Sequence, residues 1–243
     1  YVRDDSLSSQ RIDAVGVDQS GNIWYGGSGT GLHMFDGSTI TRYHQSDGLP
    51  SESPTKILFD GNGNVWVGFW DGGVVKYDGT NWTTYDSDDG LCDNYIQDIA
   101  VDENGNMYFM SFNGCISKFD GTNFTTINGP PSSSETFNIE IGPDGSIWVV
   151  CFSFSNYSYY LSKYESSSWT DIDPIPAIPL ETMVSEIKFD AFGNLWLATA
   201  AGLARFNGTW KLFSSNDGLP FDDVSDIDID MEHNIWATTK TAG

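Results

Sequence analysis

Basic residues are scarce in this chain, whose 243 residues include 11 Lys and Arg against 34 Asp and Glu, a formal net charge of −23 at pH 7. A chain this acidic is repelled by phosphate backbones and by anionic membrane surfaces. Long apolar runs are missing too, and the longest, residues 147–152, is too short to cross a bilayer. We therefore expect no nucleic-acid partner and no direct insertion into a membrane.

Cysteine is equally rare, with three residues in the chain, Cys92, Cys115 and Cys151. They lie far apart and match no zinc-binding or redox spacing. An odd number rules out a complete disulfide framework within the chain but leaves one bridge open. The simplest interpretation is that all three are small, partly buried hydrophobic residues.

Helical periodicity is also missing, because Gly-Asn and Asp-Gly pairs interrupt the chain about every ten residues. The sequence has instead an internal repeat, Asp-x-x-Gly-Asn-x-Trp, that recurs six times with 42, 42, 40, 48 and 40 residues between its aromatic anchors. The anchors are Trp24, Trp66, Tyr108, Trp148, Trp196 and Trp236. An Asp stands six residues before each anchor, except in the fourth repeat, where Gly142 replaces it.

Each repeat divides into four short strands, which we expect at 56–60, 64–68, 73–77 and 81–85 in the second repeat. They are rich in β-branched or aromatic residues and are bounded by Gly, Asp or Asn, which tolerate tight turns. Four strands in about 40 residues, with one Trp in each unit, are typical of a β-propeller. Such sheets are apolar on both faces and bury them between neighbouring blades. The sequence therefore predicts an all-β propeller of four-stranded blades, with the anchor residues Trp24 to Trp236 packed between blades.

The positions at which the sequence begins and ends within the repeat indicate whether the blades are complete. Tyr1 aligns with Tyr43, so the chain opens at the end of a fourth strand, and Gly243 aligns with Gly31, where a third strand begins. We expect one continuous propeller domain over 1–243, in a six- or seven-bladed ring whose last blade is incomplete. The unpaired sheet edge that this leaves would favour aggregation, so we expect a segment of a longer chain or a partner that completes the blade.

The repeat resembles that of the two-component regulator propeller family. The similar stretch is Asp-Gly-Asn-Gly-Asn-Val-Trp-Val-Gly at 60–68, followed by a Gly-Gly pair, by Tyr-Asp-Gly at 77–79 and by an Asp-Gly-Leu-Pro linker, as at 47–50 and 217–220. The fourth repeat departs from the pattern at Gly142 and has a Pro-rich linker.

The resemblance implies a periplasmic sensor region of a bacterial hybrid histidine kinase, often one that responds to polysaccharide fragments. It is also compatible with a secreted or surface-anchored protein. The family shares no catalytic motif, so no functional residue is carried over by position. The sequence given contains no kinase, phosphoacceptor or DNA-binding segment.

The acidic turns raise the question of a metal. Asp60, Asn62 and Asn64 have the alternating oxygen atoms of a calcium loop, but the bidentate Glu of an EF-hand is missing downstream. Because the same residues recur in most repeats, a hairpin turn that needs positive φ explains them better. We expect no metal and no cofactor.

A second acidic group lies on one predicted strand face, where Asp226, Asp228 and Asp230 alternate with isoleucines. Glu140 and Lys188 hold the position of Asp228 in the two preceding repeats. The first strand of a blade lines the propeller channel, so these groups are expected to be solvated there. Ion pairing across blades and cation binding remain open.

Catalysis has little support in the sequence. His33, His44 and His233 have no Ser or Cys at a recurrent spacing, which argues against a nucleophilic enzyme. Another propeller family with a similar repeat, the virginiamycin B lyases, needs a His and a Glu on one face, and no such pair is evident. We expect a protein that is not an enzyme and keep the lyase-like activity as a minor alternative.

A ligand site is best sought where the repeat is broken. Loops between second and third strands and between blades emerge on one face of a propeller, and there the chain has aromatic residues interleaved with Ser, Asn and Asp. Flat apolar rings with polar neighbours suit a carbohydrate fragment or a cell-envelope or protein partner. The predicted ligand-binding residues are Trp70, Asp71, Asn113, Phe154, Tyr157 and Tyr159.

Two functions from different classes follow. The first is the extracytoplasmic sensor domain of a bacterial two-component-type regulator, which binds a ligand or partner without catalysis. The second is a secreted or cell-surface propeller that acts as an interaction or adhesion scaffold. Both predict a periplasmic or extracellular location.

Overall fold

The computed structural model describes residues 11–131, 135–155, 157–172, 182–230 and 232–240. Within them the regular structure is strands, with two single-turn 3₁₀ segments at Gln45–Asp47 and Ser215–Asp217. The chain divides into two compact units, Tyr1–Gly129 and Pro130–Gly243, and each is described by itself. The predicted Pro-rich linker of the fourth repeat falls largely outside the described residues.

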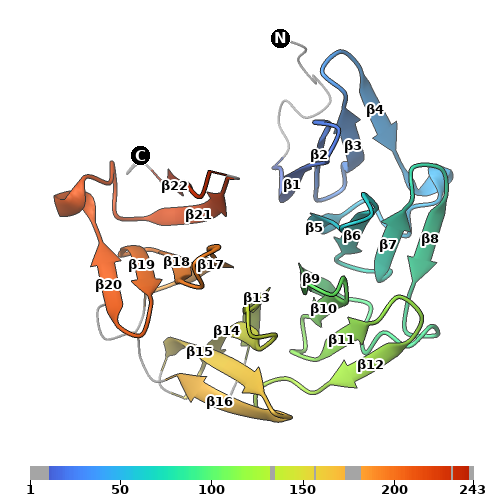
Figure 1. The fold of residues 1–243 in the computed structure, drawn as a ribbon. Coiled ribbons are helices and arrows are strands. Elements are labelled where there is room, and N and C mark those ends of the chain that lie inside the picture. Colours follow the sequence, from blue (N-terminus) through green and yellow to red (C-terminus); the bar gives the residue numbers. More distant parts are fainter. Residues whose placement is uncertain (1–10, 132–134, 156, 173–181, 231, 241–243) are drawn as a thin grey trace. The chain divides into compact units, whose positions relative to one another are not determined.

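The first unit contains three four-stranded antiparallel sheets, each a meander in chain order (Figure 1). The strands are β1 (Ala14–Val17), β2 (Ile23–Gly27), β3 (Gly31–Phe35) and β4 (Ile40–Tyr43); β5 (Pro54–Phe59), β6 (Val65–Phe69), β7 (Val74–Tyr77) and β8 (Trp82–Tyr85); and β9 (Ile96–Val101), β10 (Met107–Ser111), β11 (Ile116–Phe119) and β12 (Phe124–Ile127). The first strands of successive sheets are neighbours, β1 with β5 and β5 with β9. Each sheet is therefore one blade, stacked on the next.

The second unit repeats this plan with two four-stranded sheets and one two-stranded sheet. The strands are β13 (Glu135–Ile141), β14 (Ile147–Ser153), β15 (Ser158–Glu165) and β16 (Ser168–Ile172); β17 (Val184–Phe189), β18 (Leu195–Thr199), β19 (Gly202–Phe206) and β20 (Trp210–Phe213); and β21 (Val224–Ile229) and β22 (Ile235–Thr239). The multi-blade, all-β propeller predicted from the repeat is confirmed, and the sixth repeat supplies two strands among the described residues.

The acidic turn between the first and second strands is explained by its hydrogen bonds. One carboxylate oxygen of Asp60 accepts the backbone N–H groups of Asn62 and Asn64, both at 2.9 Å. The other accepts the Asn64 amide at 2.7 Å and the Trp66 indole N–H at 3.0 Å. Gly63 takes the left-handed conformation, with φ of 82°. Each oxygen of the Asp60 carboxylate thus accepts two hydrogen bonds within the turn. These bonds support the interpretation of the motif as a hairpin turn rather than a calcium loop.

The same hydrogen bonds shift the ionisation of the turn. Burial raises the pKa of Asp60, but the bonds from Asn64, from Trp66 and from the backbone outweigh it and hold the pKa below its ordinary value of 3.8. The unfolded chain thus takes up this proton first as the pH falls. The stabilisation is present above about pH 4 and is lost as the pH falls through the folded-state pKa.

This pH dependence is tested by Asp60→Asn, which places an amide donor against the donors of Asn64 and Trp66. We expect the free energy of unfolding at pH 7 to fall by about 2 kcal/mol, and the difference from the wild type to shrink as the pH approaches 3. Urea unfolding at pH 7, 5 and 3 measures this. Glu103→Gln, an exposed change that removes the same charge, is the control for overall repulsion. A difference that stays constant over this pH range would contradict the account.

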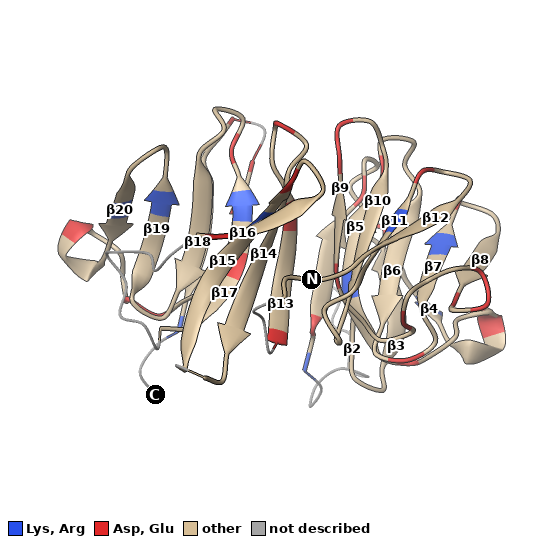
Figure 2. Ribbon diagram, turned by 90° about the horizontal axis from the view of Figure 1, so that it is seen from below, with Lys and Arg blue, Asp and Glu red and all other residues tan. Residues whose placement is uncertain are grey.

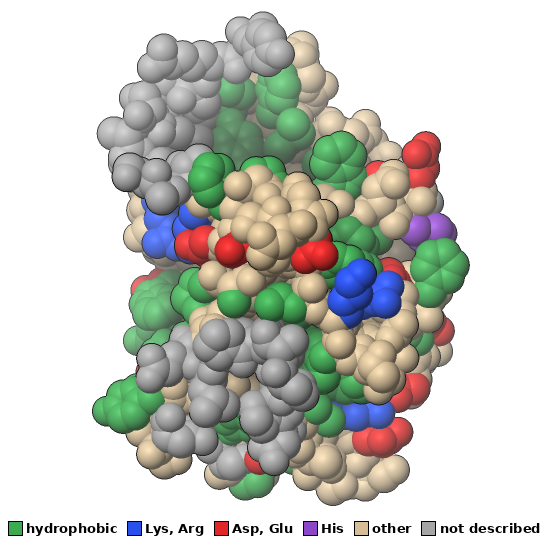
Figure 3. Space-filling model, turned by 90° about the vertical axis from the view of Figure 1, so that its left-hand side faces the viewer, with side chains coloured by type: hydrophobic (Ala, Val, Ile, Leu, Met, Phe, Trp, Pro, Cys, Tyr) green, Lys and Arg blue, Asp and Glu red, His purple; other side chains and the backbone are tan. Residues whose placement is uncertain are grey.

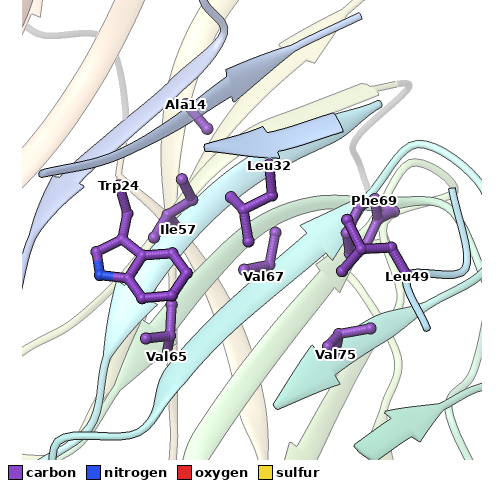
Figure 4. Close-up of a cluster of buried hydrophobic side chains, with 9 residues drawn as sticks. All are labelled: Ala14, Trp24, Leu32, Leu49, Ile57, Val65, Val67, Phe69 and Val75. Carbon is purple, nitrogen blue, oxygen red and sulfur yellow. The ribbon is translucent and has the colours of Figure 1, made fainter. Parts of the chain in front are cut away.

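The anchor aromatics of the first two repeats pack between blades. Trp24 is 3% exposed and lies against Ile57, Val65 and Val67 of the next sheet (Figure 4). Trp66 is 2% exposed and packs on the third sheet in the same way. The prediction that every anchor is packed is wrong at the sixth repeat, where 65% of Trp236 is exposed. Among the described residues of its unit no sheet follows β22, so nothing there covers this ring.

A recurring contact that the sequence analysis missed lies on the third strands. A basic side chain sits over the anchor ring, as in Lys76 on Trp66 at 5.6 Å and Arg205 on Trp196 at 5.8 Å, and Figure 2 shows these blue segments on β7 and β19. Lys118 and Lys163 repeat the contact in their blades. Four of the 11 basic residues thus make cation–π contacts within their own blades. On the side shown in Figure 3, basic groups occur in small patches between acidic and apolar ones.

Candidate functional site

Three exposed aromatic side chains meet at one end of the first unit. Trp70 follows the end of β6, Phe112 follows the end of β10, and Tyr95 directly precedes β9. The Trp70 ring lies 5.6 Å from Phe112 and 6.2 Å from Tyr95, both edge-on. Trp70 is 51% exposed, Phe112 50% and Tyr95 47%. We call Trp70, Tyr95 and Phe112 the aromatic cluster.

Backbone hydrogen bonds fix where these rings stand. The N–H of Phe112 donates to the carbonyl of Tyr95 at 3.0 Å, and the N–H of Trp70 donates to that of Ser53 at 3.1 Å. The residue after each second strand is thereby tied to the residue before a first strand. The equivalent residue in the first repeat is Ser28 and in the fifth Ala200, so large aromatics here are not required by the fold.

Polar groups surround the aromatic cluster. Asp71, the predicted site residue beside Trp70, is exposed and accepts a hydrogen bond from the Ser51 hydroxyl. The predicted Asn113 donates its amide to Asp93 at 2.6 Å, and the other oxygen of Asp93 accepts the N–H of Tyr95 at 3.0 Å. Two carboxylates therefore lie in the loops that present the rings.

A disulfide joins two of these loops. Cys92 and Cys115 are bonded, and Cys151 is free and buried. The interpretation of all three as partly buried hydrophobic residues is therefore wrong for this pair. The linker before β9 and the hairpin between β10 and β11 lie at the same end of one blade, which brings two distant cysteines together. The bridge holds Asp93 and Tyr95 on one side against Phe112 and Asn113 on the other.

A groove adjoins the aromatic cluster on the side of Trp70. It has a volume of about 420 Å³ and is open to solvent. Its lining is Arg11, Asp13, Ser28, Ser53, Pro54, Thr55 and Trp70. Arg11 is ion-paired to Asp13 at 2.6 Å, so the groove combines this ion pair with three small hydroxyl side chains and the Trp70 indole.

The other predicted aromatics lie in the second unit. Phe154 is 52% exposed and Tyr157 is 65% exposed, and both rings stand edge-on to Phe152, at 5.3 and 6.4 Å. Tyr159 is half-buried on β15, where it packs against Phe137 at 5.5 Å. The structure thus brings Trp70, Asp71 and Asn113 together in one unit, and Phe154, Tyr157 and Tyr159 together in the other.

The acidic strand face is less uniform than the alternation suggested. Asp226 and Asp228 are exposed on β21, but Asp230 accepts the Trp236 indole N–H at 2.8 Å and belongs to the hairpin turn. In the first unit, the Lys56 ammonium and the buried Asp98 carboxylate of neighbouring first strands form an ion pair at 2.9 Å. Ion pairing across blades therefore occurs there, an outcome that the sequence left open.

Two histidines have defined partners. His33 is buried with its Nε2 atom 2.9 Å from the Thr30 carbonyl oxygen. His44 Nδ1 lies 2.9 Å from a carboxylate oxygen of Glu52, so the structure contains a His–Glu pair that was not evident in the sequence. The 3₁₀ turn at Gln45–Asp47 folds the linker back and brings these residues together.

The residue at the position of Glu52 accepts a backbone N–H group of its linker in other repeats as well. Its second oxygen accepts the N–H of Gln45 at 2.9 Å. In the next linker Asn94 accepts the N–H of Ser87 at 2.8 Å, and Asp222 accepts the N–H of Ser215 in the same manner. The structural role of Glu52 is therefore to stabilise the fold of its linker. Within the described ranges no three His, Cys, Asp or Glu side chains are grouped as metal ligands, and no helix is long and apolar enough to span a membrane.

Solved structures similar to this chain include an extracellular domain, an enzyme and a surface component of a secretion system. One is the extracellular domain of a putative hybrid two-component system from B. thetaiotaomicron, 19% identical with a TM-score of 0.61, covering 94% of this chain and 37% of that one. Another is virginiamycin B lyase from Staphylococcus aureus, 16% identical with a TM-score of 0.71, covering 93% and 77%. A third is PorZ, a surface component of the type-IX secretion system of Porphyromonas gingivalis, 14% identical with a TM-score of 0.66, covering 90% and 36%.

At these identities the likeness concerns the fold. No family profile matches the sequence, and no curated protein matches it either. This chain spans little more than a third of the two-component and PorZ chains, and the similar structures include an enzyme as well as extracellular domains. The resemblance found in the repeat is confirmed in that extracellular domains of two-component systems share this all-β propeller fold.

Proposed function

We propose that this propeller binds a ligand or partner without catalysis, as part of the extracytoplasmic sensor region of a bacterial two-component-type regulator. The observation that carries the proposal is the aromatic cluster, Trp70, Tyr95 and Phe112, exposed at about half of each surface and tied in place by a disulfide. The similar extracellular domains of two-component systems support the regulatory context.

The aromatic cluster has the properties of a binding surface. Its rings leave flat apolar faces open to solvent next to hydrogen-bonding groups, which suits stacking on a sugar ring or covering an apolar patch of a partner. The loops that carry Tyr95 and Phe112 are joined by a disulfide and by a backbone hydrogen bond. These side chains therefore lose little conformational entropy when a ligand binds. Burying one such ring contributes about 2 kcal/mol to affinity. A carbohydrate fragment or a cell-envelope or protein partner fits this surface.

The proposed location is periplasmic or extracellular. Disulfides persist in oxidising compartments and are rare where thiols are kept reduced, and the Cys92–Cys115 bridge supports this placement. Because the net charge is −23, we expect the surface to favour neutral or cationic partners over phosphates and sulfates.

The site is tested by two matched substitutions, Trp70→Ala in the first unit and Tyr157→Ala in the second. Each variant is assayed for melting temperature and for binding to a panel of glycans and cell-envelope fractions. We expect Trp70→Ala to weaken binding about 30-fold with the melting temperature preserved. If both variants bind like the wild type, the site lies elsewhere; if only Tyr157→Ala loses binding, the second unit holds it.

Two alternatives have observations of their own. A surface scaffold is favoured by the likeness to PorZ, and it predicts binding to envelope proteins rather than to small ligands. A lyase-like enzyme is favoured by the pair of His44 and Glu52 and by the likeness to virginiamycin B lyase, which has been solved with quinupristin. Turnover of quinupristin that His44→Ala abolishes would replace the proposed function by the enzyme.

A further inference from the structure

We propose that the aromatic cluster accepts an ammonium group, protonated or quaternary, as the part of its ligand that it recognises. This inference rests on the proposed function, because it names the chemistry of the same surface. It starts from three observations: the relative orientation of the rings, the charge of the loops that carry them, and the way the chain uses its own cations.

The rings form walls rather than a flat sheet. Tyr95 is inclined at 75° and Phe112 at 64° to the plane of Trp70. Ring faces carry negative charge density and attract cations, indole most strongly. A compact cation placed against the Trp70 face can therefore also meet an inclined neighbouring ring, whereas a flat sugar needs only one of these faces.

Two carboxylates add the complementary charge. Asp71 follows Trp70 directly and Asp93 lies two residues before Tyr95, and each is held by neutral donors, Ser51 and Asn113. The basic side chain of the adjoining groove, Arg11, is already paired to Asp13 at 2.6 Å. The local charge of the loops is thus negative, in keeping with the whole chain.

The chain itself shows that such contacts form in this fold. Among the described residues, Lys76, Lys118, Lys163 and Arg205 lie over the anchor rings at 5.3 to 5.8 Å. The further contact, of Lys211 with Phe213, is also internal. In that part of the chain none of these contacts falls on the aromatic cluster, whose three rings are each about half exposed and so can meet a cation from outside.

The test measures the affinity of the whole chain by titration calorimetry for two cations from different sources. One is free choline and the other is a short peptide carrying trimethyllysine. Each is compared with its neutral isostere, in which carbon replaces the charged nitrogen. We expect at least one cation to bind about tenfold more tightly than its isostere. A preference for choline alone indicates a small amine, and a preference for the peptide alone indicates a lysine-bearing partner.

Matched variants separate charge from ring contact. Asp71→Asn combined with Asp93→Asn should weaken cation binding about threefold to tenfold at low salt and leave the isosteres unchanged. Trp70→Ala, or Phe112→Ala if the first lowers the melting temperature, should abolish the preference. Phe192→Ala, an exposed aromatic of the second unit that lies outside the predicted site, should leave binding unchanged.

The outcomes distinguish this inference from the proposed function. If the isosteres bind as tightly as the cations, or if the double Asn variant keeps full affinity, the cation inference is overturned. Should a member of the glycan and envelope panel still bind in a Trp70-dependent manner, the proposed function stands without it. When nothing binds in a Trp70-dependent manner, both fail together.

Discussion

Trp66→Ala is expected to lower the free energy of unfolding by about 3–5 kcal/mol, the largest effect of any substitution considered for this protein. The Trp66 ring is 2% exposed, stacks on Tyr85 at 5.8 Å and donates its N–H to Asp60. Truncation leaves a cavity between two blades and removes one donor from a buried carboxylate. Urea unfolding followed by far-ultraviolet circular dichroism measures the loss.

Trp236→Ala is the matched control for this prediction. It occupies the same place in its repeat and makes the same indole bond, to Asp230 at 2.8 Å, but 65% of it is exposed. We expect a loss of about 1 kcal/mol, because a hydrogen bond is removed without a cavity. Equal losses for Trp66→Ala and Trp236→Ala would mean that packing between blades is not what the anchors contribute.

The second large effect is expected from the disulfide. Replacing Cys92 and Cys115 by Ser should lower the free energy of unfolding by about 3 kcal/mol, since the bridge closes a loop between residues 23 apart. Affinity at the aromatic cluster should fall as well, because the loops that carry Tyr95 and Phe112 are then joined by hydrogen bonds alone. Denaturant unfolding and binding are measured on the same preparation.

Cys151→Ala is the control for thiol chemistry. Cys151 is buried, and burial raises the pKa of its thiol to about 12, so reagents that attack thiolates leave it intact in the folded chain. Reducing agent should therefore destabilise the wild type and Cys151→Ala alike, and should not affect the double Ser variant. Three free thiols in the unfolded, unreduced wild type would contradict the bridge.

The repeat made most of the fold predictable. Strands expected at 64–68 and 81–85 are found at Val65–Phe69 and Trp82–Tyr85, because short runs of β-branched and aromatic residues between Gly, Asp and Asn leave little choice of where each strand lies. The exposed ring of Trp236 was not predicted. The repeat indicates which residues can be buried between blades, but it does not indicate whether a neighbouring blade covers them.

The site was predictable only in part. Trp70 stood out because it broke the repeat, whereas Tyr95 was missed because it directly precedes a strand and reads as that strand's first residue. The disulfide was missed because three cysteines allow three pairings, and the choice depends on which loops share one end of a blade. The basic residue over four of the anchors had a visible signal, a Lys or Arg directly before the third-strand aromatic, as in Lys76 before Tyr77.

The central claim is that ligand contacts the aromatic cluster, and oxidative footprinting of the tryptophans tests it most directly. Trp70 and Trp236 are 51% and 65% exposed, so both are oxidised in the free chain, and mass spectrometry reports each separately. With a ligand from the panel or the cation series at saturation, the account predicts that oxidation of Trp70 is suppressed while that of Trp236 is unchanged. Oxidation of Trp70 at an unaltered rate under saturating ligand would contradict it.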